Sequence, residues 1–364
     1  MTPTSRWAEF KRFMREELHQ LMTIKPSDRL WQMPFAAALA TGLPLLVGAF
    51  FNRMNYGLVS SLGGLVFLYL PATALYHRMV TLMACAFAMA ACYTLGVISH
   101  FFPLLMMPVL IFIAILVTMV CRFYALGPPS SLFFIMAAAI GAYTPLQVLQ
   151  VPLMVGLISM GALLAFLIAF FYSIYTLRFR EPTPALPLPS PSFDFVVFDS
   201  VVIGIFVGIS LALAQALQLH KAYWVPVSCL AVIQGASLRV VWTKQLHRVV
   251  GTGAGLLVAW GLLLLPLDKW TISLAVMVLT FVIEMTVVRH YAFAVTFITP
   301  LTILLVEAAT LGQTPPAPLI QARFFDTLLG CLVGLVGGIC LHSPGFRDLV
   351  GGQMRRLIPS RFVR

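Results

Sequence analysis

Apolar stretches long enough to cross a lipid bilayer recur throughout this 364-residue chain. One of them, PLLMMPVLIFIAILVTMV (103–120), contains no charged residue. A helix needs about 20 mostly apolar residues to span the hydrocarbon core. Hydrophobic residues make up 60% of the chain and charged residues only 10%, so many apolar side chains must face lipid rather than a protein core. The alternating segments of about 10 residues that build a membrane β-barrel are absent. The sequence therefore predicts an all-α polytopic membrane protein.

We predict twelve transmembrane helices, arranged as two groups of six. The first group is expected at 33–51, 56–74, 79–99, 101–120, 128–147 and 152–176. The second group is expected at 196–217, 223–241, 249–266, 270–288, 291–307 and 326–342. The implied domains are an N-terminal segment (1–32), a first membrane repeat (33–178), a proline-rich linker (179–195), a second membrane repeat (196–343) and a basic tail (344–364).

The distribution of positive charge predicts the orientation. With the N-terminus placed in the cytoplasm, only four of the 23 Lys and Arg residues fall outside: Arg53, Lys221, Lys269 and Arg323. Because cytoplasmic loops are enriched in Lys and Arg, both termini are expected in the cytoplasm. The net charge of +11 then indicates topology and contact with anionic lipid headgroups rather than nucleic acid.

The N-terminal segment carries apolar residues at helical spacing. Trp7, Phe10, Met14 and Leu18 recur at this spacing, beside basic residues. This pattern predicts an amphipathic helix that lies at the membrane interface or docks on the protein itself. The first long apolar run begins only near Met33, so no cleavable signal peptide is expected.

Two hexapeptides in the two halves resemble each other. CRFYAL (121–126) and VRHYAF (288–293) share an arginine, a tyrosine and an alanine at an offset of 167 residues, and Tyr56 and Tyr223 have the same offset. Matches in the same order at a near-constant spacing predict a duplicated six-helix unit.

A third match pairs YHRMV (76–80) with LHRVV (246–250), at an offset of 170 residues. Since six is an even number, the two units should enter the membrane in the same direction. They should then be related by a pseudo-two-fold axis along the membrane normal, with any substrate path at their interface.

Four arginines of these repeated motifs fall at predicted cytoplasmic helix ends: Arg78, Arg122, Arg248 and Arg289. The simplest interpretation is that they set the topology. A ring of four guanidinium groups would also concentrate anions and could bind carboxylates through paired hydrogen bonds. Three tyrosines are further candidates for contact with an anion, or members of an interfacial aromatic belt: Tyr124, Tyr291 and Tyr223.

Glu284 interrupts an otherwise apolar span and is the principal candidate for proton coupling. A carboxylate at that depth is costly and functional by default, and desolvation favours its binding of a proton. The alternative is a structural ion pair with a neighbouring helix. The corresponding residue of the first half is Val117. Asp199 is a second candidate and Asp326 a weaker one, because both are predicted close to span ends where water reaches.

The stretch LHRVVGTGAGLLVAWG (246–261) resembles a phosphate-binding loop only superficially. It lacks the lysine of that motif and continues into an apolar span. Gly251 and Gly255 share a helix face and predict close packing against another helix. The cysteines and histidines have no metal-ligand spacing, so neither a metal nor a cofactor is expected.

Residues 222–263 resemble the fusaric acid resistance family of bacterial inner-membrane proteins, which includes exporters of aromatic carboxylic acids and has the aluminium-activated malate transporters as plant relatives. The resembling pattern combines Tyr223 and Trp224 with an Arg-x-x-Gly-Thr-x-x-Gly block that begins at Arg248, and 289–305 also fits. The resemblance implies export of small organic or aromatic acids, driven by protons. Some relatives work with a periplasmic adaptor, but the large cytoplasmic regions of those exporters have no counterpart here.

Two other functions stay open from the sequence. The plant relatives suggest a passive organic-anion channel, which would need no carboxylate for coupling. A non-catalytic accessory membrane subunit is the third possibility. An enzyme is not expected, because the chain has no catalytic motif with the required spacing.

Overall fold

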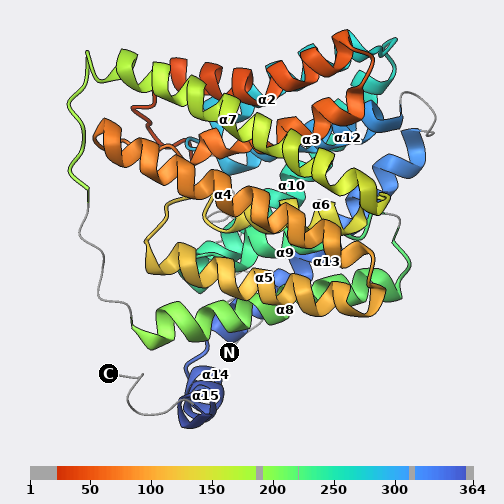
Figure 1. Ribbon diagram of the computed structural model, residues 1–364. Helices are drawn as coiled ribbons and strands as arrows, with labels where there is room; N and C mark the ends of the chain where they lie inside the picture. The colour runs from red at the N-terminus through yellow and green to blue at the C-terminus, as the bar shows by residue number, and fades with distance from the viewer. Residues whose placement is uncertain (1–22, 186–191, 220, 311–315, 358–364) are drawn as a thin grey trace, which may run out of the picture.

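The computed structural model describes residues 23–185, 192–219, 221–310 and 316–357, which form helices and no strands. The amphipathic N-terminal helix was predicted almost entirely from residues outside these ranges. The first half contains α2 (Gln32–Phe50), α3 (Met54–Gly64), α4 (Leu75–His100), α5 (Pro103–Phe123), α6 (Leu132–Tyr143) and α7 (Val151–Thr176). The second half contains α8 (Asp199–Ala216), α9 (Trp224–Ile233), α10 (Leu238–Leu263), α11 (Lys269–Thr286), α12 (Tyr291–Thr310) and α13 (Pro316–His342). Figure 1 shows these helices side by side, with the longer ones roughly aligned.

Shorter helical segments join or follow these elements. They are the 3-10 helices Leu65–Tyr69 and Val148–Gln150, the π-helices Asp194–Phe198 and Arg347–Gly351, and the short helices α14 (Pro344–Phe346) and α15 (Gly352–Leu357). The end of the bundle where α7 ends and α8 begins is called the linker end below.

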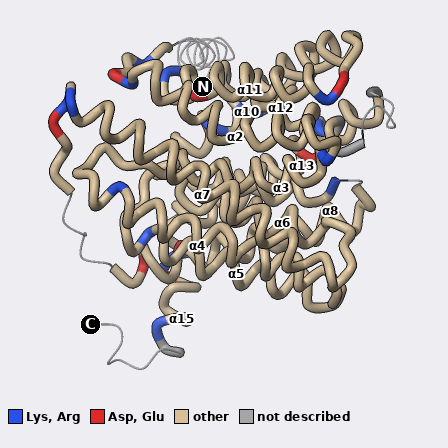
Figure 2. The backbone as a smooth tube through the Cα atoms, turned by 45° about the horizontal axis from the view of Figure 1, so that its top comes forward, with Lys and Arg blue, Asp and Glu red and all other residues tan. Residues whose placement is uncertain are grey.

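Eight of the described helices are long and apolar enough to cross a membrane: those of 32–50, 75–100, 103–123, 148–176, 194–216, 238–263, 269–286 and 317–342. Four shorter apolar helices lie at 54–69, 132–143, 224–233 and 291–306. The protein is therefore an all-helical, multi-pass membrane protein. Charged residues lie mostly towards the two ends of the bundle (Figure 2).

Two helices begin ten or more residues earlier than the sequence predicted. The predicted spans began at 249 and 326, whereas α10 begins at Leu238 and α13 at Pro316. The start of α10 is fixed by Ser237, whose side chain accepts a hydrogen bond from the backbone N–H of Val240. The prediction assigns residues 238–241 to the preceding span, and Lys244 in α10 and Arg323 in α13 interrupt the apolar pattern before the predicted starts.

Helix packing in the two halves follows the same scheme. Within each half the third helix packs against the fifth, α4 against α6 and α10 against α12, and the second against the sixth, α3 against α7 and α9 against α13. Between the halves, α5 packs against α8 and α11 packs against α2, while α6 contacts α9 and α12 contacts α3. Each of these helix pairs thus has a counterpart when the two halves are exchanged.

Glycines allow α10 and α12 to approach closely. A Cβ atom on Gly251 would lie 2.5 Å from the carbonyl oxygen of Ala292, and one on Gly255 would lie 2.7 Å from that of Thr296. A Cβ atom on Gly253 would meet nothing within 4 Å. The face that carries Gly251 and Gly255 therefore has no room for side chains, whereas Gly253 points away from it.

Candidate functional site

A central cavity of about 2110 Å³ lies between the two halves. The four shorter apolar helices contribute to its wall, namely α3 and α6 from the first half and α9 and α12 from the second. Its lining extends from Arg122 at the linker end to Lys221 near the opposite end. The cavity exceeds the volume of an ordinary small-molecule site, so it can hold a small organic acid together with water.

At the linker end, the segment before α2 forms part of the cavity wall and contacts the second half. The backbone N–H of Lys25 donates to the carbonyl oxygen of Arg289 at 2.9 Å. Nη1 of Arg29 lies 2.8 Å from Oε2 of Glu284 and also donates to the backbone carbonyl oxygen of Glu284. Glu284 is 8% exposed and lines the cavity. Its ion-pair partner therefore comes from the N-terminal segment, not from a neighbouring transmembrane helix.

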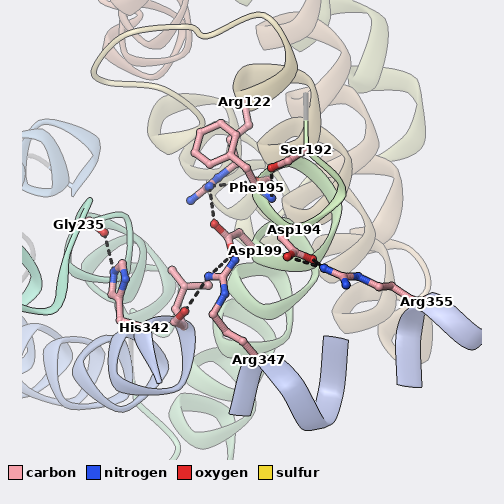
Figure 3. Close-up of polar contacts among 10 residues, drawn as sticks. Arg122, Ser192, Asp194, Phe195, Asp199, Gly235, His342, Arg347 and Arg355 are labelled. Atoms are coloured by element: carbon pink, nitrogen blue, oxygen red, sulfur yellow. Dashed lines mark hydrogen bonds and ion pairs between the residues drawn. The ribbon is translucent and has the colours of Figure 1, made fainter. Parts of the chain in front are cut away.

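Asp199 is held between two arginines (Figure 3). Nη1 of Arg122 on α5 lies 2.8 Å from Oδ2, and Nη1 of Arg347, just after α13, lies 2.9 Å from Oδ1. Arg122 also donates to the carbonyl oxygen of Phe195 and lies over its ring, 4.6 Å from the centroid. Arg355 pairs with Asp194 beside this group. These contacts tie α5, the start of α8 and the C-terminal segment together.

Arg248 lies deep in the second half rather than at a helix end. It is the eleventh residue of α10, about 15 Å from the helix start, and only 5% exposed. Nη1 donates to the hydroxyl of Tyr291 at 3.1 Å and Nη2 to that of Ser228 at 3.2 Å. Both partners are neutral, so these contacts leave the positive charge of Arg248 uncompensated.

The four repeated arginines do not form one ring. Arg122, Arg248 and Arg289 line the cavity together with Tyr223 and Tyr291, as predicted candidates, whereas Arg78 and Tyr124 are absent from its described lining. Arg78 lies in the first turn of α4 and donates to the carbonyl oxygen of Thr73 and the hydroxyl of Thr176. Tyr124 is exposed. The two His-Arg motifs thus occupy different positions, because α10 extends further before its motif than α4 does.

Two buried charged residues were misplaced by the sequence reasoning. Arg323 was expected in an outer loop and Asp326 near a span end, but both lie within α13, at 5% and 1% exposed. The guanidinium group of Arg323 lies over the ring of Trp224, 4.4 Å from its centroid, and both residues line the cavity. The spacing of Arg323 and Asp326 places them one helical turn apart. This would have indicated a shared site if the helix start had been predicted correctly.

Within the described residues, no group of three or more His, Cys, Asp and Glu side chains could hold a metal ion. The site instead offers buried guanidinium groups, tyrosine hydroxyls and a tryptophan ring. These groups can recognise an anion with a flat apolar body.

Comparison with known proteins relates the second half to a family. Residues 202–337 match the family model described as fusaric acid resistance protein-like. The uncharacterized membrane protein YvaC of Bacillus subtilis (strain 168) is 28% identical over 153 residues, which are 41% of this chain and 24% of that protein. The chain thus spans about a quarter of the length of this relative.

No solved structure matches the chain. The family match covers α9 to α12 and most of α8 and α13, and it includes Arg248, Glu284, Arg323 and Asp326. Over residues 202–337 the chain is therefore similar to the fusaric acid resistance protein-like family, and the resemblance predicted from the sequence is confirmed there.

Proposed function

We propose that this protein carries small organic anions, aromatic carboxylates among them, across the membrane through the central cavity. The observation that carries the proposal is the cavity itself, which lies between the two halves and is lined by Arg122, Arg248 and Arg289. Positive charge along such a path raises the local concentration of anions. The similarity of residues 202–337 to fusaric acid resistance proteins supports an organic acid as the substrate.

The proposed setting is the inner membrane of a bacterium, with export from the cytoplasm. Twelve helices would cross or enter the membrane as two parallel six-helix units, with both termini in the cytoplasm. The duplication is supported because corresponding pairs of helices pack together in both halves. The distribution of Lys and Arg supports the orientation. Anionic lipids would contact the basic surface. A periplasmic adaptor is a weaker proposal, since it rests on the resemblance alone.

Proton coupling would act through Glu284. In its ionised form Glu284 binds Arg29 and thereby holds the segment 23–31 against α11. Protonation would remove the charge that attracts Arg29, so this segment could leave the linker end of the cavity. Asp199 is a less favourable coupling group, because two arginines stabilise its ionised form.

A passive anion pathway is the second candidate function. The presence of lining residues from both ends of the bundle in one cavity supports it, and such a pathway requires no coupling carboxylate. An accessory membrane subunit without transport of its own is the alternative if neither activity is found.

The test uses purified protein in liposomes loaded with radiolabelled benzoate. We expect efflux above that of protein-free liposomes, accelerated by a pH gradient. The variant Glu284→Gln should lose the acceleration and keep its fold, as measured by thermal unfolding. Steady benzoate currents in a planar bilayer without a pH gradient would favour the passive pathway. Absence of both efflux and current for benzoate and for aliphatic carboxylates would contradict the proposed function.

A further inference from the structure

Arg323 and Asp326 are two buried charged residues for which no side-chain hydrogen bond or ion pair is found among the described residues. They lie one turn apart on α13, about 4.5 Å along the helix axis. Nε and Nη1 of Arg323 and both carboxyl oxygens of Asp326 are buried and have no hydrogen-bond partner in the described part of the chain. Unpaired buried polar atoms are costly, so this place in the cavity wall is a candidate for ligand binding.

The surroundings of Arg323 carry an excess of positive charge. Its face is covered by the ring of Trp224. Arg248 on α10 is close enough for the two guanidinium groups to repel each other. Arg248 has only neutral hydrogen-bond partners, Tyr291 and Ser228, and its Nε has none among the described residues. Two buried cations thus lie close together, with the Asp326 carboxyl group near Arg323, and an added anion would reduce the excess of positive charge.

The titratable and charged groups around Arg323 and Asp326 come from several helices. On α13 they are Arg323 and, about two turns after it, the thiol of Cys331, which lies close to both arginines. Tyr223 at the start of α9 is close enough to feel the charge of Asp326. On α8 the titratable residue is Asp199, which lies at the far end of α13, next to Arg347. On α10 and at the start of α12 they are Arg248 and Tyr291.

We propose that Arg323 and Asp326 form a site that binds a monocarboxylate and a proton together, with Arg248 as the second cation and Trp224 as the apolar wall. The proposal rests on the proposed function and gives its substrate a place in the cavity. The carboxylate binds the free edges of the guanidinium groups, where charge-assisted hydrogen bonds are strongest. Its apolar body lies against the aromatic rings of Trp224 and Tyr223, which contact each other.

Binding of the anion and the proton is coupled by simple electrostatics. A carboxylate on Arg323 would repel an ionised Asp326, so a proton binds to Asp326 and neutralises it. Reciprocally, protonation of Asp326 removes a competing negative charge from Arg323 and raises its affinity for the carboxylate. Linkage requires that the two effects be equal in size. This site differs from Glu284, whose carboxylate already has a cationic partner in Arg29.

The experiment measures benzoate binding to the purified full-length protein in lipid nanodiscs by titration calorimetry, at about pH 6 and about pH 8, on either side of neutrality. Benzoate itself is ionised at both values. Wild-type protein should bind benzoate about 10-fold more tightly at the lower pH and take up a proton on binding, which is revealed by buffers of different ionisation enthalpy. Asp326→Asn should bind equally well at both values, as tightly as wild type at the lower pH.

Arg323→Gln should weaken binding by about 10-fold or more, because a charge-assisted contact is lost. Arg323→Lys should restore part of it, and Glu284→Gln should keep the pH dependence of binding. Thermal unfolding confirms that each variant is folded. An unchanged pH dependence in Asp326→Asn, or unchanged affinity in Arg323→Gln, would overturn the site while liposome transport could still succeed. Wild-type protein that neither binds nor transports benzoate or aliphatic carboxylates would overturn both the site and the proposed function.

Discussion

In the first half of the chain, α4 packs against α6 and α3 against α7; in the second half, α10 packs against α12 and α9 against α13 in the same way. The buried charges differ sharply. Among the described residues, Arg78 is the charged side chain that the first half buries, whereas the second half buries Asp199, Arg248, Glu284, Arg323 and Asp326. A common helical framework therefore serves two purposes. The first half contributes wall, packing and the partly buried Arg122 of the cavity lining, whereas the second half contributes most of the buried charges.

Glycines reinforce the likeness of the two frameworks. Gly96 on α4 faces the carbonyl oxygen of Ala138 on α6, as Gly251 on α10 faces that of Ala292 on α12. Close helix approach is thus used at the same pair of helices in both halves, where small residues let the backbones meet. The buried carboxylate Glu284 has no such correspondence, because the matching residue of the first half is Val117.

The sharpest test of this comparison is the pair Arg248→Gln and Arg78→Gln. Arg248 lines the cavity and Arg78 is not part of its described lining. We expect Arg248→Gln to slow benzoate efflux from liposomes about 10- to 100-fold, since one charge-assisted hydrogen bond contributes about 1.5–3 kcal/mol.

Arg78→Gln should lower the unfolding temperature, because the carbonyl oxygen of Thr73 loses its donor. Transport per folded molecule should be unchanged. Equal loss of transport in both variants would show that the arginines of both halves take part in transport.

The next largest effect is expected at the linker end, where Asp199 joins two arginines. Asp199→Asn should destabilise the protein by about 2 kcal/mol, somewhat less than a fully buried pair because Arg347 is partly exposed. Asp194→Asn is the matched control. Its pair with Arg355 is far more exposed and should contribute less than about 1 kcal/mol. Thermal unfolding in detergent measures both, and similar losses would argue against a structural role for the Asp199 group.

An effect of similar size is expected from the glycines of α10. Gly251→Ala and Gly255→Ala should each destabilise the protein by about 1–3 kcal/mol, because the added methyl group meets backbone oxygens of α12. Gly253→Ala, on the open face, should be neutral or stabilising by up to about 1 kcal/mol. Equal effects at all three positions, measured by unfolding in detergent, would show that α12 does not pack on this face.

The smallest effect concerns the starts of two corresponding helices, α5 and α11. Phe102 precedes α5 and provides no side-chain cap, whereas Asp268 caps α11 by accepting a hydrogen bond from the backbone N–H of Thr271. This hydrogen bond holds the pKa of Asp268 below its ordinary value of 3.8. The stabilisation is present above that value and is lost as the pH falls through the lowered pKa. The difference in unfolding temperature between wild type and Asp268→Asn should therefore shrink in strong acid. A difference in unfolding temperature that stays constant with pH would show that the ionised Asp268 cap is not its cause.

Much of the fold follows from hydrophobicity alone. Each of the twelve apolar segments contains a helix, because a stretch of apolar residues in lipid must satisfy its backbone hydrogen bonds internally. The predicted helix boundaries were wrong where charged residues lie within a helix. The prediction assigns the first turn of α10 to the preceding span (223–241), places residues 242–248 around Lys244 in a loop, and puts the residues around Arg323 outside the last span.

The candidate site was only partly predictable for the same reason. Arg248 and Glu284 stand out because they recur in a motif or interrupt an apolar run. The sequence cannot indicate that the partner of Glu284 is Arg29, since the two are brought together only by the packing of α2 on α11. Nor does it show that Arg323 lies over Trp224, a contact between α13 and the start of α9.

The most direct test of transport through the central cavity is a cysteine placed in its wall. Ala231 on α9 lines the cavity, whereas Ala254 on α10 is exposed on the outside. Because the native Cys121 also lines the cavity, each protein carries Cys121→Ser. Liposomes with this background alone, or with Ala231→Cys or Ala254→Cys added, are treated with an anionic thiol reagent, and benzoate efflux is then measured. We predict that the reagent blocks efflux only through Ala231→Cys and that benzoate slows this reaction. Complete labelling of Ala231→Cys with unchanged efflux would contradict a path through the cavity.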